Sequence, residues 1–121
     1  MESIFFLLAT SFIFIHELDA IRHKEWKLFL VLKDLEDHVA YPIWLFLHLP
    51  FFLFPLFAIA PELAGDTKLI LRNSFDIFLI IHLFLHLWFR KHPDYKFHSV
   101  VSNLFLYSAA GFGLIDLITL I

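Results

Sequence analysis

Four apolar segments, each long enough to cross a bilayer, divide this chain. They lie near residues 3–22, 40–60, 71–90 and 97–119. A transmembrane helix needs about 20 predominantly apolar residues. Hydrophobic residues make up 60% of the 121 residues, whereas soluble proteins contain about 45–50% apolar residues, so a water-soluble domain of this size would expose too many of them. The sequence predicts an all-α fold: a single-domain integral membrane four-helix bundle over residues 1–121.

The connection between the first two segments, residues 23–38, mixes apolar and charged side chains. Trp26, Leu28 and Leu32 alternate with lysines and acidic residues. Such a mixture is typical of a helix that lies in the membrane interface, with tryptophan at the depth of the headgroups. We therefore expect a short interfacial helix between spans 1 and 2.

Lysine and arginine gather in two of the connections and thereby predict an orientation. Of the nine such residues in the chain, only Lys68 and Arg72 lie at the opposite side. The other seven are Arg22, Lys24, Lys27, Lys33, Arg90, Lys91 and Lys96. Positive residues favour cytoplasmic loops, so connections 1 and 3 are expected in the cytoplasm and both termini outside. The expected location is a bacterial inner membrane.

Composition excludes several classes of function. The chain has no cysteine, so disulfides, thiolate metal sites and thiol nucleophiles are excluded. A net charge of −3 does not favour nucleic acid as a partner. The lipid bilayer is the expected partner, and an apolar small-molecule substrate, a homo-oligomer and a partner membrane subunit all remain open.

Histidines from three different spans are predicted to lie at one depth. His16 is roughly 9 Å from the cytoplasmic end of its span, at about 1.5 Å per residue. His48 and His82 each lie about 10 Å deep by the same measure. All eight histidines fall in the cytoplasmic half or its rim. Ionisable groups within a membrane are costly and usually functional, so this distribution indicates a site.

Helical geometry then sorts these side chains by face. His82 and His86 are spaced i,i+4, so both imidazoles can bind one metal ion. His16 shares a face with Asp19 and His23, whereas Glu17 points about 100° away from His16. Glu17 is therefore expected to face a neighbouring helix.

The leading hypothesis is a transition-metal site in the cytoplasmic half of the bundle. The predicted metal ligands are His16, Asp19, His48, His82 and His86. Glu17 is predicted to be a catalytic general base or a residue that orients a ligand. Imidazole and carboxylate ligands suit zinc, iron or manganese. The corresponding enzyme would be a membrane metal-dependent hydrolase or oxidoreductase acting on an apolar substrate.

Three alternatives use the same residues. His48 and His82, from separate spans at equal depth, could hold a b-type haem. The buried acids and histidines could instead form a proton or ion relay. The chain could also be a small structural subunit of a membrane complex, in which polar side chains only hold the helices together. A structural role is expected for Asp76 and Asp116, which lie near the outer ends of their helices. Either residue can pair with Arg72, and Asp76 can instead cap its helix or extend to the membrane interface.

Several short motifs carry a family resemblance. They are His16-Glu17-Leu18-Asp19-Ala20 followed by Glu25-Trp26-Lys27, then Leu47-His48-Leu49-Pro50, His82-Leu83-Phe84-Leu85-His86 and Pro93-Asp94-Tyr95-Lys96-Phe97. Together they resemble a family of small bacterial four-span membrane proteins of unknown function. The resemblance covers nearly the whole chain. It implies the four-span fold and singles out the same histidines, but it implies no activity.

Overall fold

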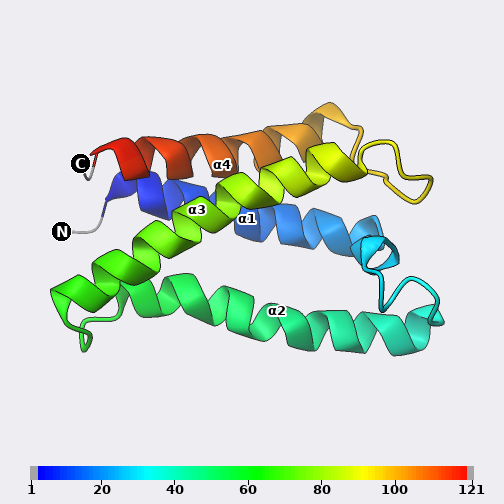
Figure 1. Cartoon of the computed structure of the whole chain (residues 1–121), viewed down its shortest axis with the longest axis horizontal. Coiled ribbons are helices and arrows are strands. Elements are labelled where there is room, and N and C mark those ends of the chain that lie inside the picture. The colour runs from blue at the N-terminus through cyan, green and yellow to red at the C-terminus, as the bar shows by residue number, and fades with distance from the viewer. Residues whose placement is uncertain (1–2, 120–121) are drawn as a thin grey trace.

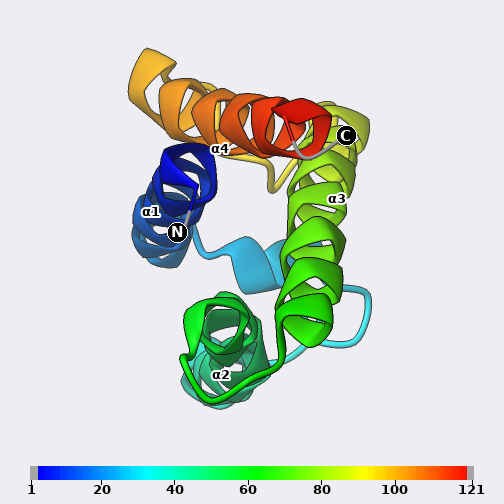
Figure 2. The ribbon, with the colours of Figure 1, turned by 90° about the vertical axis from the view of Figure 1, so that its left-hand side faces the viewer.

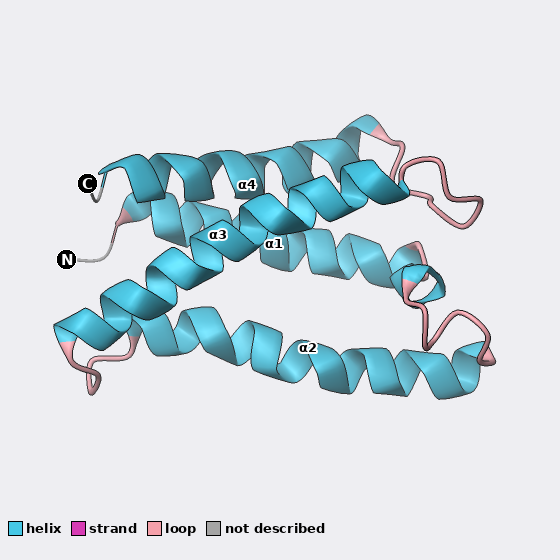
Figure 3. Cartoon of the chain, in the orientation of Figure 1, coloured by secondary structure: helices cyan, strands magenta, loops and turns pink. Residues whose placement is uncertain are grey.

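The computed structural model describes residues 3–119, which form helices joined by loops, with no strand among them (Figures 1 and 3). The long helices are α1 (Ile4–Arg22), α2 (Asp37–Ile59), α3 (Gly65–Phe89) and α4 (Val100–Thr119). Each of the four is long and apolar enough to cross a membrane. The prediction of an all-α, four-helix membrane fold is therefore confirmed.

Three helix starts differ from the predicted spans by three residues or more. Helix α2 begins at Asp37 instead of residue 40. Helix α3 begins at Gly65 instead of residue 71, because its polar first turn continues the same helix beyond the apolar run. Helix α4 begins at Val100 instead of residue 97. Phe97 is buried in the core before that helix starts, and the Ser99 hydroxyl accepts a 3.0 Å hydrogen bond from the Ser102 backbone N–H. This is the usual arrangement at a helix N-terminus.

The first connection folds inward, whereas a short helix in the membrane interface was expected. Only η1, a 3-10 helix at Glu25–Leu28, interrupts the turns that lead to α2. Trp26, Leu28 and Leu32 are buried, and η1 lies between α1, α2 and α3 (Figure 2). The turn begins at Lys24, whose φ of 52° is in the left-handed region. This turn redirects the chain after α1 and carries Glu25 into the bundle.

The helices pack around two apolar cores at opposite ends. Helix α4 lies along α1 and α3, whereas α2 packs on α3 and η1 (Figures 1 and 2). We call the end with the α1–α2 and α3–α4 connections the basic end, and the end with both termini the terminal end. The core at the basic end includes Trp26, Trp44 and Phe97. The core at the terminal end includes Phe6, Ile13, Phe75 and Leu79.

Apolar residues on the outer surface of the bundle, such as Phe46 and Trp88, are exposed, as expected for contact with lipid.

A bidentate ion pair joins α3 to α4 near the terminal end. Arg72 donates to both carboxylate oxygens of Asp116, at 2.5 and 2.6 Å, and Asp116 is fully buried. This confirms that Asp116 can pair with Arg72.

Asp76 is also fully buried, so it does not extend to the interface as expected. Neither of its carboxylate oxygens accepts a hydrogen bond from a described N–H or O–H group. Helix α4 has Gly113 opposite Asp76, where an added Cβ would lie 3.3 Å from Oδ1.

We expect Asp116→Asn to destabilise the fold by about 3 kcal/mol, because it leaves the Arg72 guanidinium without its buried counter-charge. The measurement is thermal or denaturant unfolding in detergent micelles. Asp66→Asn, in the exposed first turn of α3, is the matched control and should change stability by less than about 0.5 kcal/mol. Equal stability of the two variants would show that the Arg72–Asp116 pair does not hold α3 and α4 together.

Candidate metal centre

Three histidines from α1 and α3 meet inside the basic half of the bundle. The His16 ring lies 5.3 Å from the His82 ring and 4.7 Å from the His86 ring, centroid to centroid. The His82 and His86 rings are 4.8 Å apart. His16 is 0% exposed and His86 4% exposed. The i,i+4 spacing on α3 thus turns both imidazoles towards α1.

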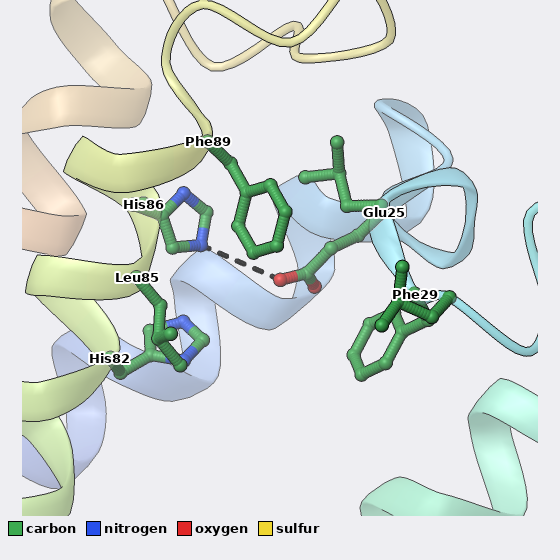
Figure 4. Close-up of a pocket in the computed structure, with 8 residues that line it drawn as sticks. Glu25, Phe29, His82, Leu85, His86 and Phe89 are labelled. Atoms are coloured by element: carbon green, nitrogen blue, oxygen red, sulfur yellow. Dashed lines mark ion pairs between the residues drawn. The ribbon is translucent and has the colours of Figure 1, made fainter.

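Glu25 completes the group from η1. Its Oε1 atom lies 3.4 Å from Nε2 of His86, and its residue is 6% exposed (Figure 4). One donor atom from each of His16, Glu25, His82 and His86 lies within 4.8 Å of the others. The sequence reasoning did not select Glu25 as a ligand, because the connection was expected to lie at the interface. The one signal in the sequence was the Glu25-Trp26-Lys27 motif.

The spacing of the donor atoms suits a small metal ion. Nε2 of His16 lies 3.2 Å from Nε2 of His86, which in turn lies 3.4 Å from the Glu25 carboxylate. Metal–ligand bonds of about 2.0–2.1 Å in a tetrahedral site place neighbouring donor atoms roughly 3.3 Å apart. These two separations therefore match two edges of such a tetrahedron. His82 offers a third imidazole nitrogen within 4.8 Å of the other donor atoms.

Several buried polar atoms around this group make no hydrogen bond with the described residues. They include Nδ1 of His16, Oε2 of Glu25 and Nε2 of His82. A buried donor or acceptor without a partner costs about 1–3 kcal/mol. A cation bound by Glu25 and the imidazoles would satisfy Oε2 of Glu25 and Nε2 of His82. The donor set is thus suited to a metal ion.

The charge on Glu25 is also suited to metal ligation. Burial alone would raise its pKa, but the hydrogen bond with His86 and the charges of the neighbouring imidazoles outweigh burial and hold the pKa of Glu25 at about 2. Glu25 is therefore an anion at neutral pH. It can bind a cation without first losing a proton.

Tyr95, from the α3–α4 loop, orients the His86 ring. Its hydroxyl lies 3.1 Å from Nδ1 of His86, and burial raises the pKa of Tyr95 to about 12, so the phenol stays protonated. In neutral His86 with Nδ1–H donating to this hydroxyl, Nε2 carries a lone pair, and a bound metal ion would then take the place of the hydrogen bond to Glu25. Such partners of a metal-bound histidine set its tautomer and its orientation.

Glu17 and His48 form a second pair beside the group. Nε2 of His48 lies 3.1 Å from Oε2 of Glu17, and Nε2 of His82 lies 3.9 Å from Oε1 of Glu17. Nδ1 of His48 donates to the Trp44 carbonyl at 2.7 Å, because a carbonyl can only accept. The close contact of Nε2 with the Glu17 carboxylate therefore requires a proton between them. Glu17, His48 and Glu25 also form a second set of potential metal ligands.

Asp19, the predicted carboxylate ligand, lies outside both groups found in the described part of the chain. Its Oδ2 accepts a 2.5 Å hydrogen bond from the Ser102 hydroxyl, and its Oδ1 lies 3.3 Å from Nε2 of His23. These contacts turn the carboxylate towards α4. The structure thus brings His16, His82 and His86 together, places His48 beside them through Glu17, and holds Asp19 elsewhere.

An apolar cavity of about 320 Å³ reaches the histidine group from the side of η1 and α3 (Figure 4). Glu25, His82 and His86 line its polar side. The rest of its lining is apolar and consists of Leu28, Phe29, Leu30, Leu85 and Phe89. A molecule in this cavity can therefore contact the candidate ligands while its apolar part remains among hydrocarbon side chains.

Residues 2–121 match the model of a family of unknown function, DUF6713. The chain belongs to this family. No curated protein and no solved structure matches the chain. The family match agrees with the expected membership of a family without an assigned function, so functional inference rests on the geometry of the site.

Because Asp19 bonds to Ser102 and not to the histidine group, we expect Ser102→Ala to lower stability by about 1–2 kcal/mol and leave metal content unchanged. Unfolding and elemental analysis of the purified variant measure the two effects. Ser108→Ala on the same helix is the control for stability. Loss of bound metal in Ser102→Ala would place Asp19 in the metal centre after all.

Proposed function

We propose that this protein binds a transition metal ion through His16, Glu25, His82 and His86 within the membrane. One observation carries the proposal: three imidazoles, two of them buried, and an ionised carboxylate place donor atoms within 4.8 Å of one another. Nitrogen and oxygen ligands without thiolate suit zinc, iron or manganese. The observed separations of 3.2 and 3.4 Å suit the short bonds of these ions better than the longer bonds of calcium.

Glu17 and His48 would serve the metal centre as a proton-holding pair. The proton between them lies next to His82, and so next to the group that would hold the metal. A carboxylate in this position can accept a proton from a water or substrate held there. This assigns Glu17 the role of general base and His48 that of its ion-pair partner.

A two-metal centre is the second candidate. Glu25 belongs to both potential ligand groups, so its carboxylate could bridge one ion held by the histidines and another held by Glu17 and His48. Carboxylate-bridged metal pairs are known from helix bundles. The number of ions bound per chain separates this candidate from the single-ion site.

The apolar cavity supports an apolar substrate that reaches the site from the bilayer. Its volume of about 320 Å³ suits a short acyl or alkyl chain, and its polar side is formed by Glu25, His82 and His86. A metal-dependent hydrolase or oxidoreductase is the enzyme class consistent with this arrangement. When bound, the metal would polarise a substrate oxygen or activate a water.

The geometry favours a metal ion over the other functions. A haem between His48 and His82 needs its macrocycle between the two rings, where the Glu17 carboxylate contacts both imidazoles. A proton relay would use the same Glu17–His48 pair without a metal. A purely structural subunit would gain little from the unpaired polar atoms around the group.

The proposed setting is a bacterial inner membrane, with the basic end of the bundle in the cytoplasm and both termini outside. Seven of the nine lysine and arginine residues lie in or next to the two connections at this end. In this orientation, the metal centre lies in the cytoplasmic half of the bilayer.

We expect Glu25→Gln to lower metal affinity by about 10–100-fold or more, because the amide is a weaker ligand and carries no charge. Purified protein is stripped with chelator and titrated with Zn²⁺, Fe²⁺ or Mn²⁺, and bound metal per chain is measured by elemental analysis. Glu36→Gln, on an exposed side chain, is the matched control and should bind metal as the wild type does.

Tyr95→Phe should weaken metal binding less than Glu25→Gln, since it removes only the hydrogen-bond partner of His86.

Each alternative predicts a different result in these measurements. Two ions per chain would favour the Glu25-bridged centre, whereas a Soret absorbance band would favour haem. Proton flux in metal-free liposomes that Glu17→Gln abolishes would favour a relay. Absence of stoichiometric metal in wild-type protein that remains folded would overturn the proposal.

The cavity can be tested separately through Leu85→Trp, which would fill it from α3. With Co²⁺ in the site, a medium-chain alkyl hydroxamate should bind more tightly than acetohydroxamate, as followed by the cobalt absorption spectrum. Leu85→Trp should remove this preference for the longer chain while acetohydroxamate still binds. Leu87→Trp lies on the same helix outside the cavity lining and should keep the preference. An unchanged preference in Leu85→Trp would exclude the cavity as the site for an apolar substrate.

A further inference from the structure

A second cavity, with a different character, opens at the basic end. Its volume is about 310 Å³, and its lining consists of Arg22, His23, Lys24, Lys27, Asp94 and Lys96. These residues come from the end of α1, the first connection and the α3–α4 loop. None of them belongs to the candidate metal groups. Segments far apart in the sequence thus direct four cationic side chains towards one concavity.

The positive charge of this basic pocket is only partly neutralised. Lys24 and Lys27 share the carboxylate of Asp37, at 2.5 and 3.2 Å. Arg22 and Lys96 form no ion pair with any carboxylate in residues 3–119. Asp94 is the only carboxylate in the lining, and its contact is with His92 at 3.9 Å. The pocket therefore retains an excess of positive charge that an anion can neutralise.

The backbone at Lys24 is a second, independent observation. Its left-handed φ and ψ of 52° and 52° are unfavourable for a residue with a side chain and cost roughly 1 kcal/mol. Lys24 is also the only non-glycine residue with positive φ in the described chain. Strained backbone of this kind clusters at binding sites, where the surrounding structure maintains it. Here it places a lysine in the pocket at a position where glycine or asparagine would be favoured.

We propose that the basic pocket binds a phosphate-type oxyanion, presented either by an anionic lipid headgroup or by free phosphate. Arginine offers a planar pair of donors that matches phosphate oxygens, and lysine adds point charges around it. The pocket lies at the ends of the spanning helices, where the headgroups of a surrounding bilayer would lie. Clusters of basic residues at this level attract anionic lipids. The inference is independent of the proposed metal site, because it uses none of its ligands.

The lipid source is tested with the full chain in nanodiscs. Discs of phosphatidylcholine with and without phosphatidylglycerol are compared by native mass spectrometry, which counts the lipids retained on the protein. The double variant Arg22→Gln/Lys96→Gln should bind phosphatidylglycerol roughly thirty-fold more weakly, at about five-fold for each basic residue lost. The control is Lys33→Gln/Lys91→Gln, which removes the same charge from the same end outside the pocket. It should retain wild-type binding.

The free-phosphate source is tested by calorimetric titration of detergent-solubilised protein with inorganic phosphate. Phosphate binding that the Arg22/Lys96 double variant loses and the Lys33/Lys91 variant keeps would support the site and identify free phosphate as its ligand. Lipid retention with the same dependence, without phosphate binding, would support the site and identify the headgroup. Equal effects of the two double variants in both assays, or no binding in either, would overturn the proposal.

Discussion

The contact between Glu25 and His86 is the interaction on which the arrangement of the basic half depends. It joins the first connection to α3, in a region where Nδ1 of His16, Oε2 of Glu25 and Nε2 of His82 have no hydrogen-bond partner among the described residues. Trp26, next to Glu25, packs against Trp44 of α2 at a ring separation of 5.9 Å. The connection therefore fixes α2 to the bundle with its apolar side chains, and its one buried carboxylate is a candidate metal ligand. A loop placed at the membrane surface could do neither.

Much of this structure could be predicted from apolar length and helical geometry alone. Segment length predicted four spans, and equal depth together with i,i+4 spacing brought His16, His82 and His86 to one place. Glu25 could not be identified in the same way. It lies in a connection that folds inward, and such a segment has no helical period from which the depth of a side chain follows. Asp19 was misplaced for another reason. Its angle on α1 agrees with that of His16, but the Ser102 hydroxyl on α4 accounts for where the carboxylate points. Angles on one helix cannot show which neighbouring helix offers the better partner.

The buried charged groups have different kinds of partner at the two ends of the bundle. At the terminal end, Arg72 and Asp116 form a neutral bidentate pair, and such a pair is complete without any ligand. At the basic end, three histidines and Glu25 lie together, and the ion-pair partner of Glu25 among residues 3–119 is His86, not a lysine or arginine. Imidazoles that are neutral leave Glu25 without a fixed counter-charge, and imidazoles that are protonated repel one another at ring separations of 4.7 to 5.3 Å. A bound cation resolves both difficulties, because it neutralises Glu25 and binds the nitrogen lone pairs. This is the physical reason to favour a metal over a structural polar cluster.

The turn at Lys24 and Glu25 contributes one residue to each of the two proposed sites, the basic pocket and the metal centre. The left-handed residue Lys24 lines the basic pocket, and the next residue, Glu25, points into the bundle towards His86. Neighbouring residues in a tight turn project in different directions. The same backbone conformation therefore directs Lys24 towards the proposed anion site and Glu25 towards the proposed metal site. Asp37 strengthens this arrangement, since it bonds to Lys24 and to the Trp26 indole and thereby ties the turn to the start of α2. A ligand that orders the turn from the pocket side would also hold Glu25 in place.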